Sequence, residues 1–200
     1  MQPTQTLPPN YRPIWTIDLK NNLRAILWLN LLGLGLFILA AWAFTQALYL
    51  LRPAEGRAGL AASLDFQGIG DILQAGLAFL ALYALMIVVH EAFHGVFFWV
   101  FTRQRPVFAL SWAYAYAAAP GWYLPRNPYL VTAVAPLAGI SLLALLALAF
   151  GPPGWFLPAL VVAASNAGGA VGDVWVIVWL LRQPPTCYAQ DRGDAVTLFN

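Results

Sequence analysis

The chain of 200 residues is 61% hydrophobic and 9% charged, which is too apolar and too poorly charged for a soluble domain. Its formal net charge of +2 comes from scattered Lys and Arg, so it lacks the basic field that nucleic-acid binding requires. We therefore expect an integral membrane protein that is surrounded by lipid and has no nucleic-acid partner.

The first half of the chain divides into a polar lead-in and two long apolar runs. Residues 1–24 are polar and contain prolines, and we expect them to form a short cytoplasmic lead-in. Residues 25–51 carry no charge and exceed the roughly 20 residues that cross a bilayer, so they predict a first transmembrane helix. A cleaved signal peptide is the alternative, but its apolar region would be only about 7–15 residues long. Residues 52–71 contain charges and glycines and predict an exposed connection to a second span over residues 72–101.

The segment after the second span is rich in aromatic residues and proline. Trp112, Tyr114 and Tyr116 recur with period two, which is typical of a strand, and Pro120-Gly121 is a turn signal. We predict a short β-hairpin at the cytoplasmic face of the membrane. Anchoring of the aromatic side chains at the interface is the alternative interpretation.

The remaining chain contains two further apolar runs and a polar end. Residues 129–150 and 155–181 predict the third and fourth spans. Residues 182–200 are expected to form a polar tail without a further element, and their single cysteine, Cys187, allows no internal disulfide. The predicted fold class is therefore an all-α membrane protein of about four transmembrane helices, in which residues 25–181 form one domain.

Lys and Arg are distributed unevenly over the expected loops. With four spans and a cytoplasmic N-terminus, only Arg52 and Arg57 lie outside, and the other eight lie inside: Arg12, Lys20, Arg24, Arg103, Arg105, Arg126, Arg182 and Arg192. Because short cytoplasmic loops carry an excess of Lys and Arg, we expect a multi-pass protein of the cell membrane with both termini and the hairpin in the cytoplasm.

The sequence HEAFHG at residues 90–95 contains both histidines of the chain. On a helix His90 and His94 lie one turn apart on the same face, where they can bind one Zn²⁺ with Glu91 beside the metal. A carboxylate in that place can take a proton from a zinc-activated water and pass it to a leaving amine. Both flanking runs are uncharged, and ionisable groups are costly in such surroundings unless they are paired or metal-bound. A buried polar cluster that only joins helices, or a structural zinc site, is the alternative.

A catalytic zinc site usually has three protein ligands, so a third is expected besides the histidines. Asp173 is the only ionisable residue of the predicted fourth span. His94 and Asp173 each lie nine positions before a predicted cytoplasmic arginine, so at about 1.5 Å per residue they have similar depths. Asn166 lies about two turns before Asp173 on the same helix face and could hydrogen-bond a substrate backbone or support the metal. The alternative is that Asp173 only forms hydrogen bonds between helices.

These motifs together resemble a small bacterial and archaeal family of zincin-type peptidases of unknown substrate. The zinc motif, the proline-rich hairpin, the Ala-Pro step at residues 135–136 and the Gly-rich segment ending in Gly172-Asp173 carry the resemblance, which spans roughly residues 76–181. The family is similar to the site-2 proteases, which are intramembrane metalloproteases, although those usually carry the aspartate in an LDG or NPDG sequence. The resemblance implies that both histidines and Asp173 bind zinc and that Glu91 is the catalytic base.

The expected function is a membrane-embedded zinc metalloprotease that hydrolyses peptide bonds in or near the membrane. Its cofactor would be Zn²⁺ and its substrate a peptide or a membrane protein. A noncatalytic metal-binding scaffold or chaperone is the alternative. A metal transporter is disfavoured because the spans contain few other polar residues along their length.

Overall fold

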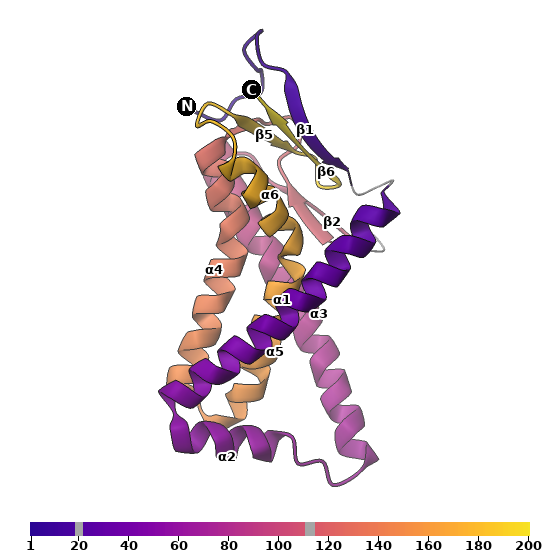
Figure 1. The fold of residues 1–200 in the computed structure, drawn as a ribbon, viewed down its shortest axis with the longest axis vertical. Helices are drawn as coiled ribbons and strands as arrows, with labels where there is room; N and C mark the ends of the chain where they lie inside the picture. The colour runs from indigo at the N-terminus through magenta and orange to yellow at the C-terminus, as the bar shows by residue number, and fades with distance from the viewer. Residues whose placement is uncertain (19–21, 111–114) are drawn as a thin grey trace.

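The computed structural model describes residues 1–18, 22–110 and 115–200, and it is mostly helical (Figure 1). The helices of the described residues are α1 (Leu23–Leu51), α2 (Pro53–Ser63), α3 (Ile69–Thr102), α4 (Arg126–Phe150), α5 (Phe156–Gly169) and α6 (Val171–Leu181), with a 3₁₀ turn at Pro153–Trp155. The strands are β1 (Pro13–Asp18), β2 (Val107–Leu110), β3 (Ala115–Ala118), β4 (Leu124–Pro125), β5 (Tyr188–Asp191) and β6 (Ala195–Phe199). The predicted class, all-α with one short hairpin, is therefore too narrow, because a four-stranded antiparallel sheet accompanies the helices as well.

Helices α1, α3 and α4 are each long and apolar enough to cross a membrane, as the sequence predicts for the first three spans. The expected fourth span is broken, because α5 and α6 are bent by 49° around Ala170. Gly168 and Gly169 end α5, and glycine has a low helix propensity, which favours a break there. The described residues thus contain three candidate spans, or up to four if the bent pair counts as one.

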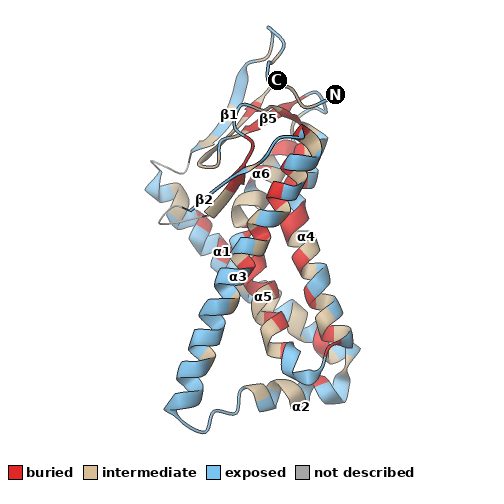
Figure 2. Ribbon diagram, turned by 180° about the vertical axis from the view of Figure 1, so that it is seen from behind, coloured by how far each residue is buried: buried red, intermediate tan, exposed pale blue. Residues whose placement is uncertain are grey.

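Helix α1 crosses α5 diagonally at a point where both backbones touch (Figure 1). A Cβ atom added to Gly33 of α1 would lie 2.7 Å from the carbonyl oxygen of Gly168 in α5. Small residues of this kind let membrane helices approach closely. The first half of α3, in contrast, is almost entirely exposed, whereas its second half packs against α4 and α5 (Figure 2).

Helix α2 lies across the end of the bundle away from the sheets (Figure 1). The sequence predicts an exposed connection here, and residues 53–63 are mostly exposed, but they form a helix that was not predicted. Pro53 begins the helix at a position where proline is favoured. Gly56, which reads as a turn signal, is buried against Leu48 of α1. Arg52 fixes the corner by donating a hydrogen bond to a backbone carbonyl of the α4–α5 connection.

Both ends of the chain meet in one antiparallel sheet at the opposite end of the molecule, with strand order β1-β6-β5-β4 (Figure 1). The expectation that the C-terminal tail has no further element is therefore wrong, and the lead-in contributes β1. These short strands are stabilised by pairing with distant segments, which local sequence does not reveal. Trp15 of β1 stacks on Trp179 of α6 with ring centroids 5.1 Å apart, so the sheet is attached to the bundle. The division into lead-in, domain and tail stays a prediction.

The predicted hairpin is present as the two-stranded antiparallel sheet of β2 and β3. Tyr116 lies in β3, whereas Trp112 and Tyr114 lie outside the described residues. The turn at Pro120-Gly121 is also present, with Gly121 at a φ of +79°. It follows β3 and leads toward β4, however, so it does not join the two hairpin strands.

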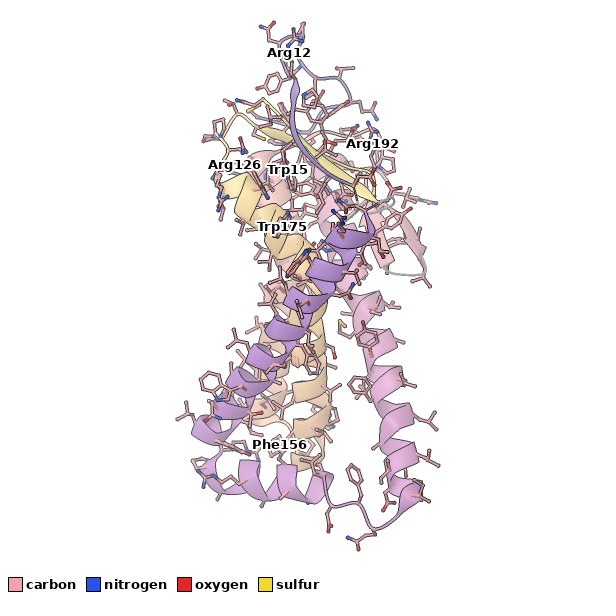
Figure 3. All side chains as sticks on the ribbon, turned by 45° about the vertical axis from the view of Figure 1, so that its right-hand side comes forward. Arg12, Trp15, Arg126, Phe156, Trp175 and Arg192 are labelled. Carbon is pink, nitrogen blue, oxygen red and sulfur yellow. The ribbon has the colours of Figure 1, made fainter. Side chains whose placement is uncertain are left out.

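A buried core lies between the four-stranded sheet and helices α3, α4 and α6. Its largest members are Phe98, Leu124, Tyr129, Leu180 and Leu198. Figure 3 shows the labelled Arg12, Arg126 and Arg192 at this end, and Phe156 near α2 at the other. The core fixes the second half of α3 relative to the beginning of α4 and to α6, and these helices carry the candidate residues.

Candidate metal centre

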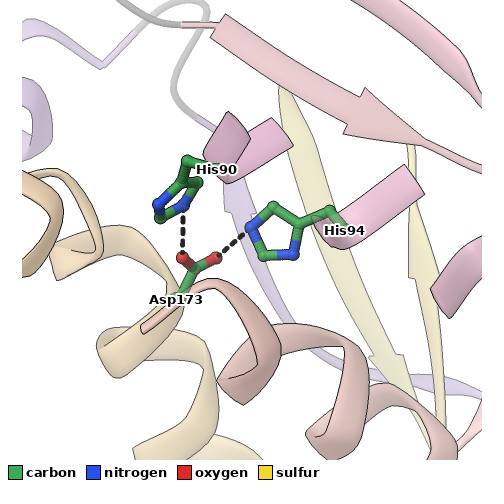
Figure 4. Close-up of side chains that lie close together, drawn as sticks. All are labelled: His90, His94 and Asp173. Carbon is green, nitrogen blue, oxygen red and sulfur yellow. Dashed lines mark hydrogen bonds and ion pairs between the residues drawn. The ribbon is translucent and has the colours of Figure 1, made fainter. Parts of the chain in front are cut away.

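His90, His94 and Asp173 form one cluster between α3 and α6 (Figure 4). The histidines project from one face of α3, a turn apart, and Asp173 lies in the first turn of α6. Asp173 Oδ2 is 3.1 Å from His90 Nε2, and its Oδ1 is 3.3 Å from His94 Nε2. The three residues offer ligand atoms within 4.8 Å of one another and could hold a metal ion. The structure thus brings together the three side chains that the sequence pattern places at similar depth.

The other ring nitrogen of each histidine has a fixed partner. His90 Nδ1 is 2.9 Å from Asn166 Oδ1, and His94 Nδ1 is 3.0 Å from the backbone carbonyl oxygen of Thr132. The amide nitrogen of Asn166 donates to the carbonyl oxygen of Pro136 at 3.3 Å, which orients the Asn166 amide with its oxygen toward His90. Because amide and carbonyl oxygens only accept hydrogen bonds, each Nδ1 carries the hydrogen and donates.

This arrangement leaves the Nε2 atoms as acceptors. In a neutral imidazole with hydrogen on Nδ1, Nε2 carries a lone pair. Both lone pairs face the Asp173 carboxylate, which is itself an acceptor, at 3.1 and 3.3 Å. Such contacts between acceptors that are largely shielded from water are unfavourable unless a metal ion or a proton lies between them. A positive charge between these three acceptors would therefore stabilise the cluster.

The donor set of this cluster fits zinc. Two imidazole nitrogens and one carboxylate oxygen, with a fourth position left open, are typical of catalytic zinc sites. With bonds of about 2.0–2.2 Å, the ligand atoms of a tetrahedral zinc site lie roughly 3.3 Å apart, which is close to the distances from Asp173 to both histidines. Hydrogen bonds from the remaining ring N–H groups to oxygen acceptors are the contacts that usually orient zinc-binding histidines.

Glu91 follows His90 on α3 and lines the same cleft. It is half-buried, and its Oε2 atom is buried without a hydrogen-bond partner among the described residues. The backbone of Ala117 in β3 lies beside this carboxylate, so the hairpin borders the site. The structure thus leaves one acceptor of Glu91 available to a water molecule or a substrate group.

The cluster opens into a cleft of about 630 Å³ between α1, α3, α6 and the sheets. Apart from the candidate residues themselves, the wall that α1 and α3 provide is mostly apolar, with Asn30 of α1 as a polar exception. Ser165 of α5 also lines the cleft, and its buried hydroxyl has no hydrogen-bond partner in the part of the chain that the structure describes. An extended peptide with apolar side chains could contact the apolar wall with its side chains and the polar groups of Asn30 and Ser165 with its backbone.

Asp191 reaches the cleft from the end of β5. Its Oδ2 accepts a hydrogen bond from the Tyr129 hydroxyl at 2.6 Å, and its Oδ1 accepts one from the Gly193 N–H at 2.7 Å. Burial raises the pKa of Asp191 above its usual range, although both hydrogen bonds act in the opposite direction. Sequence reasoning missed this residue, because it lies in the segment that was expected to be a plain tail.

The structure also shows which group Asn166 contacts. The sequence leaves open whether Asn166 contacts substrate or supports the metal, and the structure places its amide against His90. Thr132 is not predicted at all, since its contribution is a backbone carbonyl. The signal that could have found it is Pro136, because a proline inside a helix leaves the carbonyl four residues earlier without its usual donor.

Comparison with known proteins assigns a family. Residues 83–188, just over half of the chain, match a protein family described as "Putative zincin peptidase". The chain belongs to this family. The matched region runs from the middle of α3 into β5 and so contains the three clustered residues and Glu91. Membership of the zincin peptidase family indicates a peptidase and implies zinc as the metal. No curated protein and no solved structure matches the chain.

Proposed function

We propose that this zincin family member is an integral membrane zinc metallopeptidase that hydrolyses peptide bonds in or near the membrane. The observation that carries the proposal is the direction of the two imidazole rings. Their Nδ1–H groups are held by oxygen acceptors, so both Nε2 lone pairs face Asp173. The unpartnered carboxylate oxygen of Glu91 lies in the same cleft.

In this proposal His90, His94 and Asp173 hold the zinc ion and Glu91 is the general base. Bound zinc supplies polarisation of the scissile carbonyl and lowers the pKa of water toward neutrality. Glu91 takes a proton from the attacking water and passes it to the amine nitrogen as the C–N bond breaks, which leaves a carboxylic acid and an amine. Asn166 and the Thr132 carbonyl keep the two rings oriented.

The surroundings of the site support a membrane setting. Three helices are apolar and long enough to span a bilayer, and the cleft wall between α1 and α3 is mostly apolar. We place the protein in the cell membrane as a multi-pass protein, with residues 25–181 as one transmembrane domain and both termini in the cytoplasm. The substrate would be a peptide or a membrane protein. The likeness to site-2 proteases rests on sequence motifs alone.

The proposal is tested by zinc content and peptide hydrolysis of detergent-purified protein. The wild type is compared with Glu91→Gln, His94→Ala and Asp173→Ala, and the hydrolysis probe is a mixture of quenched fluorogenic peptides with apolar cores. We expect zinc in the wild type and in Glu91→Gln, and its loss from the other two variants. Because Glu91 would act only in proton transfer, Glu91→Gln should lower the hydrolysis rate about 10²–10⁴-fold.

Two results would contradict parts of the proposal. A folded wild-type protein that stays free of zinc after zinc is supplied would exclude the metallopeptidase. Zinc bound by the predicted residues, with no difference in hydrolysis between the wild type and Glu91→Gln, would favour the noncatalytic metal-binding scaffold or chaperone.

A further inference from the structure

Pro136 interrupts the backbone hydrogen bonds of α4 beside the histidine pair. In a helix the carbonyl of residue 132 accepts a hydrogen bond from the N–H of residue 136, but proline has no N–H. The Thr132 carbonyl oxygen therefore lacks its usual helical donor, and it accepts a hydrogen bond from His94 Nδ1 at 3.0 Å instead. Thr132 and Pro136 are both fully buried, so bulk water cannot act as the donor.

Pro136 also acts on the other histidine, through its own carbonyl group. Its carbonyl oxygen accepts a hydrogen bond from Asn166 Nδ2 at 3.3 Å. With its nitrogen held in this way, the Asn166 amide presents its oxygen to His90 Nδ1 at 2.9 Å. The two supporting hydrogen bonds of the histidine pair thus converge on one residue of α4.

We propose that Pro136 is a positioning residue that sets the tautomers of both histidines. For His94 it acts through its missing N–H, and for His90 through its carbonyl. In an uninterrupted helix the N–H of residue 136 would engage the Thr132 carbonyl, and the Nδ1–H tautomer of His94 would lose its preferred acceptor. The inference rests on the proposed metal site, because only the Nδ1–H tautomer leaves Nε2 free for zinc.

The simpler interpretation is that Pro136 merely bends or packs the helix. Pro128 provides a matched control because it lies in the first turn of the same helix. The first N–H groups of a helix have no intrahelical acceptor, so Pro128→Ala removes a proline without returning a hydrogen bond to a helix carbonyl. Pro136→Ala returns one N–H, which can donate to the Thr132 carbonyl, and keeps the carbonyl that Asn166 uses.

The first readout is the tautomer of each histidine in zinc-free protein, measured by ¹⁵N NMR of histidine-labelled protein at a pH at which the ¹⁵N shifts show both rings to be neutral. In the wild type and in Pro128→Ala we expect hydrogen on Nδ1 of both rings. In Pro136→Ala we expect His94 to lose this preference while His90 keeps it, since alanine retains the carbonyl of residue 136. A general disturbance of the helix would not change the tautomer of His94 while leaving that of His90 unchanged.

The second readout is zinc affinity, measured by competition with a chelator. Loss of a hydrogen bond that orients a metal-binding histidine typically weakens metal binding about 10–100-fold, and we expect this for Pro136→Ala but not for Pro128→Ala. Unchanged Nδ1–H on His94 in Pro136→Ala, or zinc affinity equal to that of the wild type, would overturn the inference. Failure of the wild type to bind zinc would instead overturn the proposed function, and the NMR of the zinc-free protein would still decide the role of Pro136.

Discussion

Ser165 and Asn166 are neighbours on α5, both are buried, and only Asn166 contacts a candidate ligand. Asn166→Ala should weaken zinc binding about 10–100-fold, because His90 Nδ1 loses its acceptor. Ser165→Ala should leave zinc affinity unchanged, because its hydroxyl has no hydrogen-bond partner among the described residues. Chelator competition on both detergent-purified variants measures the difference. An equal loss in both would show that α5 was disturbed as a whole and that Asn166 has no particular role.

Asp191 and Tyr129 join the sheet to α4 by a hydrogen bond of 2.6 Å. Burial raises the pKa of Asp191, the hydrogen bonds from Tyr129 and Gly193 and the charge of His94 lower it, and Asp173 raises it, with a net rise. A carboxyl group with a raised folded-state pKa binds a proton on folding. Its contribution to the free energy of unfolding therefore falls as pH rises from the usual Asp value of about 3.9 through the folded pKa.

Tyr129→Phe should make the protein less stable, and the loss should be larger at about pH 8 than at about pH 5. The variant removes a donor that favours the ionised form of Asp191, so the folded pKa rises further. Above that pKa the lost hydrogen bond to a carboxylate is worth about 1.5 kcal/mol, at the low end of the usual range because Asp191 is only partly buried. Thermal unfolding in detergent at both pH values measures it. A loss that does not depend on pH would assign the effect to packing of the ring.

At the scale of residues, the sequence predicts the side chains of the site but not their backbone partners. HEAFHG and Asp173 could be found because helical spacing and the cost of buried charge are local rules. The hydrogen bond to the Thr132 carbonyl cannot be predicted from residue type, because every residue has a backbone carbonyl. Which carbonyl His94 reaches depends on where α4 lies relative to α3. Only the proline four positions later hints at it.

At the scale of elements, long apolar runs were predictable and shorter elements were not. α1, α3 and α4 begin and end within a few residues of the predicted spans, because about 20 apolar residues have few alternatives to a membrane helix. α2 was missed because its glycines suggest turns, whereas Gly56 is a contact surface for Leu48. The break around Ala170 was missed because the apolar run continues through it.

The crossing of α1 and α5 yields a prediction about two glycines of one helix. Gly33→Ala would place a Cβ atom 2.7 Å from the Gly168 carbonyl oxygen, whereas a Cβ at Gly35 meets nothing within 4 Å. Overpacking of this kind typically costs about 1–3 kcal/mol. Gly35→Ala should be neutral or stabilising by up to about 1 kcal/mol, because alanine has the higher helix propensity.

Thermal unfolding of both glycine variants in the same detergent compares them directly. We expect a lower midpoint for Gly33→Ala and an equal or higher one for Gly35→Ala. Equal midpoints would mean that α1 shifts along α5 without cost and that the glycine contact does not fix the crossing.

At the scale of the whole molecule, the sheet at the end of the bundle is the feature that local sequence could not predict. β1 and β6 pair across nearly the full length of the chain, with Thr16 opposite Thr197. Each strand is only four to six residues long, apart from the shorter β4, so none carries a distinctive pattern by itself. In the proposed membrane setting, their pairing requires an even number of crossings between β1 and β6, which agrees with counting the bent pair α5 and α6 as the fourth span.

This closed arrangement makes the proposed orientation testable with engineered cysteines. Asn10 is exposed near the sheet, and Gln67 is exposed between α2 and α3 at the other end. Arg12, Arg126 and Arg192 lie at the sheet end (Figure 3), so an excess of positive charge in cytoplasmic loops favours that end inside the cell. In intact cells a membrane-impermeant maleimide should label Gln67→Cys, and it should label Asn10→Cys only after lysis.

The native Cys187 should react little with the maleimide, because it is fully buried. Its burial also raises the pKa of the thiol, which disfavours the reactive thiolate. The reverse labelling pattern would reverse the proposed orientation and place the sheet, with Asp191 of β5, outside the cell. Labelling of both variants in intact cells would contradict an odd number of crossings between residues 10 and 67. In that case α1 would not span the membrane.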